Sequence, residues 1–192
     1  MKTALAIFVK TPKLSPVMTR LSSSIGKPAA MQFYGLCLDA IVELVKPLRI
    51  SVFWAVAELE AVDHTIWQDF PTLYTGEGCL GQRQHFIYNA LLKKHEKVIL
   101  IGTDIPQLSY ELIQETMSKK TQSSFVMGPS TDGGYYLFAG SVRLDLDVWT
   151  GINWDNNDVF QQLESRLPFQ VSKLSYLTDI DQKNDLWALL TE

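Results

Sequence analysis

Residues 97–106, KVILIGTDIP, decide the fold predicted for this chain. The stretch contains four consecutive β-branched or aliphatic residues, 98–101, a pattern typical of a strand buried on both faces. Gly102 ends this run, and Asp104 follows almost directly. Ligands of open α/β sheets bind just beyond the carboxyl ends of the strands, so Asp104 is expected where a metal or polar ligand would be held. The residues alone leave open that Asp104 only turns the chain.

The composition limits the classes of function. The chain has 192 residues, 46% hydrophobic and 20% charged, so we expect one domain over residues 1–192. Its net charge of −4 gives no broad basic field, so neither nucleic acid nor a membrane is expected as a partner. Cys37 and Cys79 lack metal-ligand spacing and are expected to stay reduced. The apolar run 4–9 is too short for a signal peptide, and a cytoplasmic location is expected.

Strand and helix patterns alternate along most of the chain. Strands are predicted at 3–9, 49–57, 72–75, 98–104, 124–128, 135–139 and 171–177. Helices are predicted at 28–45, 58–70, 80–95, 109–119, 156–167 and 184–190, with Ser109 as an N-cap and Phe86 facing inward. Residues 124–139 read as a hairpin-like insertion, and 142–154 give no clear pattern. This order predicts an α/β protein with three α/β/α layers and a mostly parallel sheet.

A cationic loop follows the first strand. Residues 10–20, KTPKLSPVMTR, contain two prolines and the cations Lys10, Lys13 and Arg20. Many α/β proteins hold phosphate in a loop at this position. A solvated surface loop without a ligand explains the same residues.

Further polar groups are predicted near other strand ends. The last strand leads into Asp179 and Asp181, and Asp132 lies in the segment 129–134, PSTDGG. The paired glycines of that segment indicate either a close approach of the backbone to a ligand or a plain hairpin turn. Arg83 stands in the first turn of a predicted helix, where a cation is unfavourable for the helix dipole. This position suggests another partner for Arg83, with simple solvent exposure as the alternative.

Together these motifs resemble a family of bacterial proteins of unknown function, DUF2064, in the nucleotide-diphospho-sugar transferase (GT-A) superfamily. The family pattern K-x-P-x-x-G-x-V-K-T-R-L corresponds to residues 10–21, and G-D-L-G-x-R-M corresponds to 78–84. The motifs G-[ST]-D-x-P and G-P-x-x-D-G-G-Y-Y correspond to 102–106 and 128–136. G-I-x-W and D-I-D-x-x-x-D-L correspond to 151–154 and 179–186. The resemblance therefore covers nearly the whole chain in the same order.

The resemblance implies a GT-A fold and a glycosyltransferase that uses a nucleotide-diphospho-sugar donor, a small-molecule acceptor and Mg²⁺ or Mn²⁺. Asp104 and Asp181 would hold the metal, and Asp104 and Asp132 would be the catalytic positions. Such a metal neutralises the charge that develops on a leaving diphosphate. By the same resemblance, the residues that would contact the nucleotide or its phosphates are Lys10, Lys13, Thr19, Arg20, Arg83, Thr103, Gly133 and Gly134.

Three departures from the family pattern fall in these loops. Ser15 replaces a glycine, Met18 replaces a lysine and Cys79 replaces an aspartate. Loss of one charge-assisted contact typically costs about 1.5–3 kcal/mol, which need not abolish activity. Two alternatives therefore stay open: a nucleotidyltransferase that acts on an NTP, and a degenerate protein that binds nucleotide or sugar without turnover. The sequence leaves the nucleotide, sugar, acceptor and oligomeric state undefined.

Overall fold

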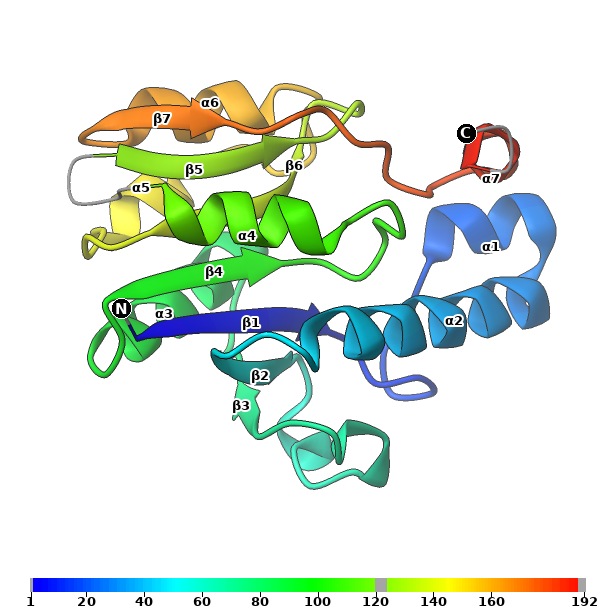
Figure 1. The fold of residues 1–192 in the computed structure, drawn as a ribbon. Helices are drawn as coiled ribbons and strands as arrows, with labels where there is room; N and C mark the ends of the chain where they lie inside the picture. The colour runs from blue at the N-terminus through cyan, green and yellow to red at the C-terminus, as the bar shows by residue number, and fades with distance from the viewer. Residues whose placement is uncertain (1, 120–123, 190–192) are drawn as a thin grey trace.

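A computed structural model describes residues 2–119 and 124–189 as a seven-stranded sheet between two layers of helices (Figure 1). The strand order is β3-β2-β1-β4-β6-β5-β7, and within this sheet only β6 runs antiparallel to its neighbours. The predicted fold class, α/β with three layers and a mostly parallel sheet, is confirmed. The strands are β1 (Thr3–Val9), β2 (Ser51–Val56), β3 (Thr72–Tyr74), β4 (Lys97–Ile101), β5 (Ser124–Pro129), β6 (Tyr135–Gly140) and β7 (Gln170–Lys173).

The helices differ from the predicted ones mainly in the connections. They are α1 (Thr19–Ile25), α2 (Lys27–Val45), α3 (Leu80–Leu92), α4 (Tyr110–Ser118), α5 (Leu146–Thr150), α6 (Val159–Arg166) and α7 (Lys183–Leu189). Ser109 caps α4 as expected, because its hydroxyl accepts the Leu112 N–H at 3.3 Å. The helix predicted at 58–70 is wrong, since two short 3₁₀ turns, Leu59–Ala61 and Thr65–Trp67, occupy that segment. The His64 ring accepts the Ile66 N–H and starts the second turn separately.

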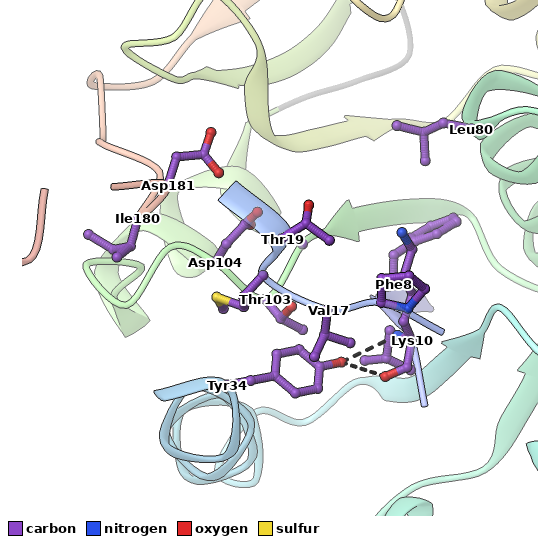
Figure 2. Close-up of a pocket in the computed structure, with 14 residues that line it drawn as sticks. Phe8, Lys10, Val17, Thr19, Tyr34, Leu80, Thr103, Asp104, Ile180 and Asp181 are labelled. Atoms are coloured by element: carbon purple, nitrogen blue, oxygen red, sulfur yellow. Dashed lines mark hydrogen bonds between the residues drawn. The ribbon is translucent and has the colours of Figure 1, made fainter. Parts of the chain in front are cut away.

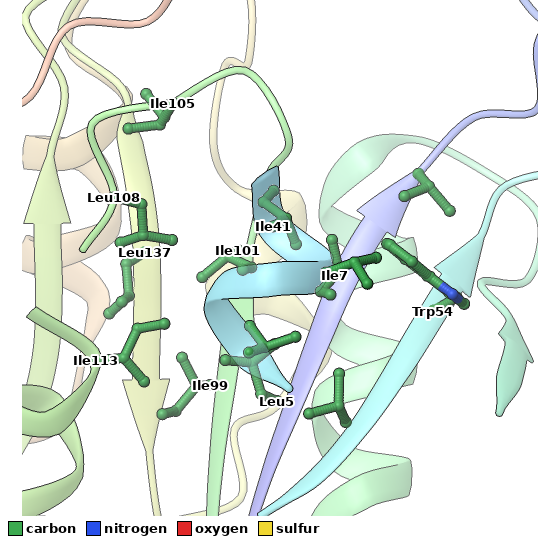
Figure 3. Packing of buried hydrophobic residues seen from close by; sticks show 14 of the residues in the cluster. Leu5, Ile7, Ile41, Trp54, Ile99, Ile101, Ile105, Leu108, Ile113 and Leu137 are labelled. Carbon is green, nitrogen blue, oxygen red and sulfur yellow. The ribbon is translucent and has the colours of Figure 1, made fainter. Parts of the chain in front are cut away.

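Alternate residues of the strands enter two hydrophobic cores, one on each face of the sheet. In β1, Leu5 and Ile7 pack with α2 and α4 (Figure 3), and Ala4 and Ala6 pack on the other face with α3, α5 and α6. By length and composition α2 could also cross a membrane, but its inner side packs in the first of these cores. The inward orientation predicted for Phe86 is wrong: it is 52% exposed, because α3 turns its neighbouring residues toward the sheet instead.

The antiparallel strand β6 determines what lies at the carboxyl edge of the sheet. β5 and β6 form the expected hairpin, with paired residues from Val126–Ala139 to Pro129–Tyr135. Because β6 runs against its neighbours, the turn at residues 130–134 lies at the edge where β1 and β4 end. A turn, rather than a strand end, therefore delivers Asp132 to this edge.

The chain after β7 crosses the same edge; we call residues 174–182 the crossing segment. The Leu177 N–H donates to the Pro129 carbonyl at 3.2 Å, and the Ile180 N–H donates to the Asp104 carbonyl at 3.0 Å. Ile180 then packs with Leu21 of α1, beside which α7 lies (Figure 1). The crossing segment thereby brings the end of the chain to the loops that follow β1 and β4.

Candidate functional site

A cavity of about 330 Å³ opens where β1 and β4 end side by side. From β1 the chain continues to β2 and β3 on one side, and β4 lies on the other, so this is the switch point of the sheet. Figure 2 shows residues from the loop after β1, from α2, from the loop after β4 and from the crossing segment around one space. The cavity is lined by Phe8, Val9, Lys10, Pro16, Val17, Met18, Thr19, Tyr34, Leu80, Gly102, Thr103, Asp104, Ile180 and Asp181.

The loop after β1 is fixed at its start by two side chains from other elements. The Tyr34 hydroxyl donates to the Lys10 carbonyl at 2.9 Å and accepts the Lys10 N–H at 3.3 Å (Figure 2). The Thr11 N–H donates to Glu58 at 2.8 Å. Burial raises the pKa of Tyr34, so its hydroxyl keeps its proton as a donor. These contacts hold Lys10 at the mouth of the cavity.

Carboxylates gather at the other end of the cavity. Because Ile180 is bonded to the Asp104 backbone, the two acids that flank Ile180 are brought to the loop after β4. Burial raises the pKa of Asp104, and the nearby charges of Asp181 and Asp132 raise it further, although Arg20 opposes this. Asp104 and Asp181, from two separate loops, therefore line one cavity, and Asp132, from a third loop, lies near enough to affect the pKa of Asp104 without lining the cavity.

Asp179 belongs to this acidic group and was not among the predicted site residues. Burial raises the pKa of its carboxyl to about 8, with further contributions from Asp104 and Asp132. Its Oδ1 atom is buried and makes no hydrogen bond to the described part of the chain. Asp179 is the first residue of the D-I-D motif, and its position two residues before Asp181, across a buried isoleucine, was the available sequence signal.

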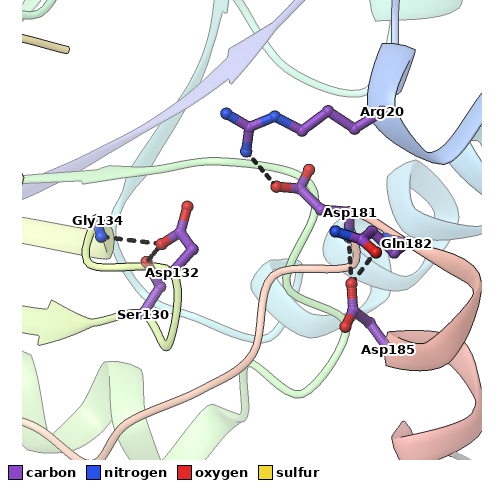
Figure 4. Close-up of polar contacts among 7 residues, drawn as sticks. All are labelled: Arg20, Ser130, Asp132, Gly134, Asp181, Gln182 and Asp185. Atoms are coloured by element: carbon purple, nitrogen blue, oxygen red, sulfur yellow. Dashed lines mark hydrogen bonds and ion pairs between the residues drawn. The ribbon is translucent and has the colours of Figure 1, made fainter. Parts of the chain in front are cut away.

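Arg20 and Asp181 form an ion pair at the rim of the cavity (Figure 4). The Arg20 guanidinium donates to the Asp181 carboxylate, and this contact raises the pKa of Arg20. The resemblance assigns these two residues to different ligands, a phosphate and a metal ion. In the structure they neutralise one another, so a phosphate at Arg20 would compete with Asp181.

The turn between β5 and β6 is held together by its own polar groups. Asp132 Oδ1 accepts the Ser130 hydroxyl at 2.6 Å and the Gly134 N–H at 2.9 Å (Figure 4). Gly133 has φ 93°, donates its N–H to the Ser130 carbonyl, and accepts the Phe160 N–H from α6 at 2.9 Å. Both glycine N–H groups are thus used inside the turn, and neither glycine lines the cavity.

Besides Arg20, which stays at the rim, two predicted phosphate-binding cations do not line the cavity. Arg83 donates to the Ala57 carbonyl and the Thr75 hydroxyl, both at 2.9 Å, and to the Gly78 carbonyl at 3.0 Å. Arg83 therefore joins the ends of β2 and β3 to the start of α3. These three oxygen acceptors are the other partner that its position in the first turn of the helix suggested. Lys13 lies on the outer side of the loop after β1, in a second cavity. Of the predicted residues, Lys10, Thr19, Thr103, Asp104 and Asp181 line the first cavity.

The acidic end fits a divalent cation by the chemistry of its donors. Mg²⁺ and Mn²⁺ prefer oxygen ligands, and the buried Asp179 Oδ1 has no hydrogen-bond donor among the residues that the structure describes. A cation would also offset the repulsion that raises the pKa of Asp104. Within residues 2–119 and 124–189, no three His, Cys, Asp or Glu side chains are arranged to hold one ion. Diphosphate oxygens and water would therefore have to supply most of the ligands.

The sequence profile of a family described as "Uncharacterized protein conserved in bacteria (DUF2064)" matches residues 42–156. The chain belongs to the DUF2064 family. The match includes three motifs of the site: the start of α3, the G-T-D-I-P loop and the D-G-G turn. None of the curated proteins matches this DUF2064 chain.

Solved structures share the fold. A Desulfovibrio desulfuricans G20 protein, provisionally described as a nucleotide-diphospho-sugar transferase, is 27% identical, with a TM-score of 0.86 over 98% of this chain and 87% of its own. A nucleotidyl transferase from Methanothermobacter is 12% identical, with a TM-score of 0.66 over 98% and 95%. Rv0371c from Mycobacterium tuberculosis H37Rv, in complex with manganese, is 11% identical, with a TM-score of 0.55 over 100% of both chains. This DUF2064 chain therefore has a nucleotide-sugar transferase-like fold.

Proposed function

We propose that this protein is a metal-dependent glycosyltransferase that moves a sugar from a nucleotide-diphospho-sugar to a small-molecule acceptor. The observation that carries the proposal is the polarity of the switch-point cavity. Phe8 and Leu80 line it with apolar surface, whereas Asp104 and Asp181 line it with carboxylates. The flat aromatic face of a nucleobase and a metal-bound diphosphate would fit such a cavity. The similarity to the Desulfovibrio protein supports the same donor class.

The lining residues then take distinct roles. Lys10 and Thr19 would donate hydrogen bonds to the diphosphate, and Asp104 and Asp181 would hold Mg²⁺ or Mn²⁺. The metal would supply positive charge where the leaving diphosphate becomes more negative. Asp132 is our candidate base for the acceptor hydroxyl: it does not line the cavity itself, but its Oδ2 atom makes no hydrogen bond within the turn.

Nucleotidyl transfer is the second candidate, and the Methanothermobacter neighbour supports it. That reaction needs cations around a triphosphate, and Lys10 is the one cation that residues 10–18, all described in the structure, contribute to the cavity. Met18 lines the cavity where the family pattern has a lysine, and Lys13 faces away. These three positions favour the sugar donor over an NTP. Because Met18 stands where the family pattern has a lysine, a protein that binds the ligand without turnover stays a third candidate.

A thermal-shift panel tests the proposal. Nucleotide-sugars with each base and the NTPs would be added with and without Mn²⁺ to wild type, Asp104→Asn and the control Asp155→Asn, an exposed loop residue. A ligand at 100 times its Kd adds about 2.7 kcal/mol to the free energy of unfolding. For a protein of this length, that corresponds to a rise of several degrees in Tm. We expect a Mn²⁺-dependent rise with one nucleotide-sugar, lost only in Asp104→Asn, and sugar release or transfer with that donor.

Other results of this panel would contradict the proposal. A rise in Tm with an NTP and with no nucleotide-sugar, together with release of pyrophosphate, would establish nucleotidyl transfer. A rise with a nucleotide-sugar that never turns over would establish a binding protein. The cytoplasmic location and the single domain stay predictions, as does the absence of nucleic-acid and membrane partners.

A further inference from the structure

A second cavity, of about 560 Å³, lies on the outer side of the loop after β1, between that loop and the α1–α2 corner. Its size falls within the range of small-molecule sites, roughly 300–1,000 Å³. The two cavities share Pro16, Val17 and Thr19, so this short stretch is the wall between them. The second cavity is lined by Lys13, Leu14, Ser15, Pro16, Val17, Thr19, Ser22, Ser23, Lys27 and Met31.

The charge of this second cavity is opposite to that of the first. Its lining includes two lysines, Lys13 and Lys27, and no acidic residue. Neither lysine forms an ion pair with the residues that the structure describes. The Leu14 and Ser15 N–H groups both donate to the Thr11 carbonyl, at 3.2 and 3.1 Å, in the tight turn that places Lys13 on this side. Two lysines that have no ion pair among the described residues, with 13 residues between them in sequence, therefore line one cavity.

Hydroxyl groups and apolar surface complete the lining. Ser15 and Ser22 make no side-chain hydrogen bond within residues 2–119 and 124–189, so their O–H groups are free to donate. Leu14 is 50% exposed, and Met31 of α2 also lines the cavity. The cavity thus offers positive charge and hydroxyl donors beside an apolar surface.

We infer that this second cavity binds a phosphate monoester with an apolar organic group. A phosphate carries a charge of about −1.5 to −2 and three strong acceptor oxygens, which the two lysines and the free hydroxyls complement. The apolar group would cover Leu14 and Met31. The site is separate from the donor cavity and requires neither nucleotide nor metal.

The test is a titration of the full chain with phenyl phosphate, followed through backbone amide NMR shifts without nucleotide or metal. We expect shifts at Ser15, Ser22 and Lys27, with weaker binding at higher salt. Lys13→Met/Lys27→Met should raise Kd by about tenfold or more, because it removes two charge-assisted contacts. The matched control Lys93→Met/Lys94→Met, at exposed positions after α3, should leave Kd unchanged.

Three results would overturn the inference. Shifts confined to residues 102–104 would place the phosphate in the first cavity. Equal shifts with benzyl alcohol would show apolar binding without recognition of the anion. An unchanged Kd in the double lysine variant, with an otherwise wild-type spectrum, would show that the lysines do not hold the phosphate. Because no nucleotide is present, each result is independent of the proposed glycosyl transfer.

Discussion

Lys97 is fully buried and closes the end of α4. Its ammonium donates to the Thr116, Met117 and Lys119 carbonyls at 2.8, 2.9 and 2.7 Å. Lys97→Met would leave these carbonyls without their donor, so we expect the free energy of unfolding to fall by about 1–3 kcal/mol. Urea denaturation measures the loss, and Lys93→Met, at an exposed position, should show none.

The same lysine predicts a pH dependence of stability. Burial lowers the pKa of Lys97 from 10.5 to about 8, so the folded protein binds this proton less tightly than the unfolded chain does. Between about pH 8 and pH 10.5, unfolding therefore takes up a proton, and stability should rise with pH. The unfolding free energy of wild type minus that of Lys97→Met should increase across this window. A decrease in this difference would mean that the three carbonyl groups raise the pKa of Lys97 instead.

Arg20 should matter for ligand binding and hardly at all for stability. Its side chain is 68% exposed and that of Asp181 is 29% exposed, and exposed pairs contribute roughly 0–1 kcal/mol. We expect Arg20→Ala to change the unfolding free energy by less than about 1 kcal/mol. If a bound diphosphate displaces Asp181 from the Arg20 guanidinium at the rim, Arg20→Ala should raise the Kd for the nucleotide-sugar by up to roughly one to two decades. Arg49→Ala, at another exposed arginine, serves as the control, and an unchanged Kd in Arg20→Ala would remove Arg20 from the site.

At the scale of elements, the turn between β5 and β6 depends on a glycine. Gly133 has φ 93°, and a Cβ there would overlap the Asn157 carbonyl. Gly133→Ala should therefore cost about 1–3 kcal/mol in strain alone. Gly35→Ala, inside α2 with nothing within 4 Å of a new Cβ, should instead stabilise the protein by up to about 1 kcal/mol. Urea denaturation of both variants tests this opposite sign, and a neutral Gly133→Ala would show that the turn adapts.

The elements that sequence reasoning found are those with a strong local pattern. The buried strands and α2 appear nearly at their predicted residues, because continuous apolar runs and helical spacing suffice to define them. α1 was missed because Met18, in the left-handed region at φ 47°, precedes it without a side-chain cap. The outward position of Lys13 and the burial of Asp179 depend on contacts between distant segments. Such contacts leave little trace in local sequence, so only part of the site could be predicted.

At the scale of the molecule, the crossing segment connects stability to the site. Ile180 is buried between α1 and α2, and Leu163 is buried in the core on the other face of the sheet. Replacement of either by alanine should cost roughly 2–5 kcal/mol. Only Ile180→Ala should also weaken nucleotide-sugar binding, because the Ile180 side chain, packed with Leu21 and Ala30, fixes the segment that carries Asp179 and Asp181. Calorimetric titration of both variants, below their unfolding temperatures, distinguishes the two effects. If the two variants bind the nucleotide-sugar with equal affinity, the crossing segment does not contribute to binding.

The loop after β1 lies between two cavities and adds little to either large core. The main core takes Val9 before the loop, and only Val17 and Met18 of the loop pack against it in part. We therefore expect that the loop can be exchanged for another without disturbing the strands and helices around it. The corresponding stretch of the Desulfovibrio protein could be grafted between Val9 and Thr19 without repacking the sheet. A set of these chimaeras would allow ligand preference to be re-engineered on one scaffold, with both cavities altered by a single exchange.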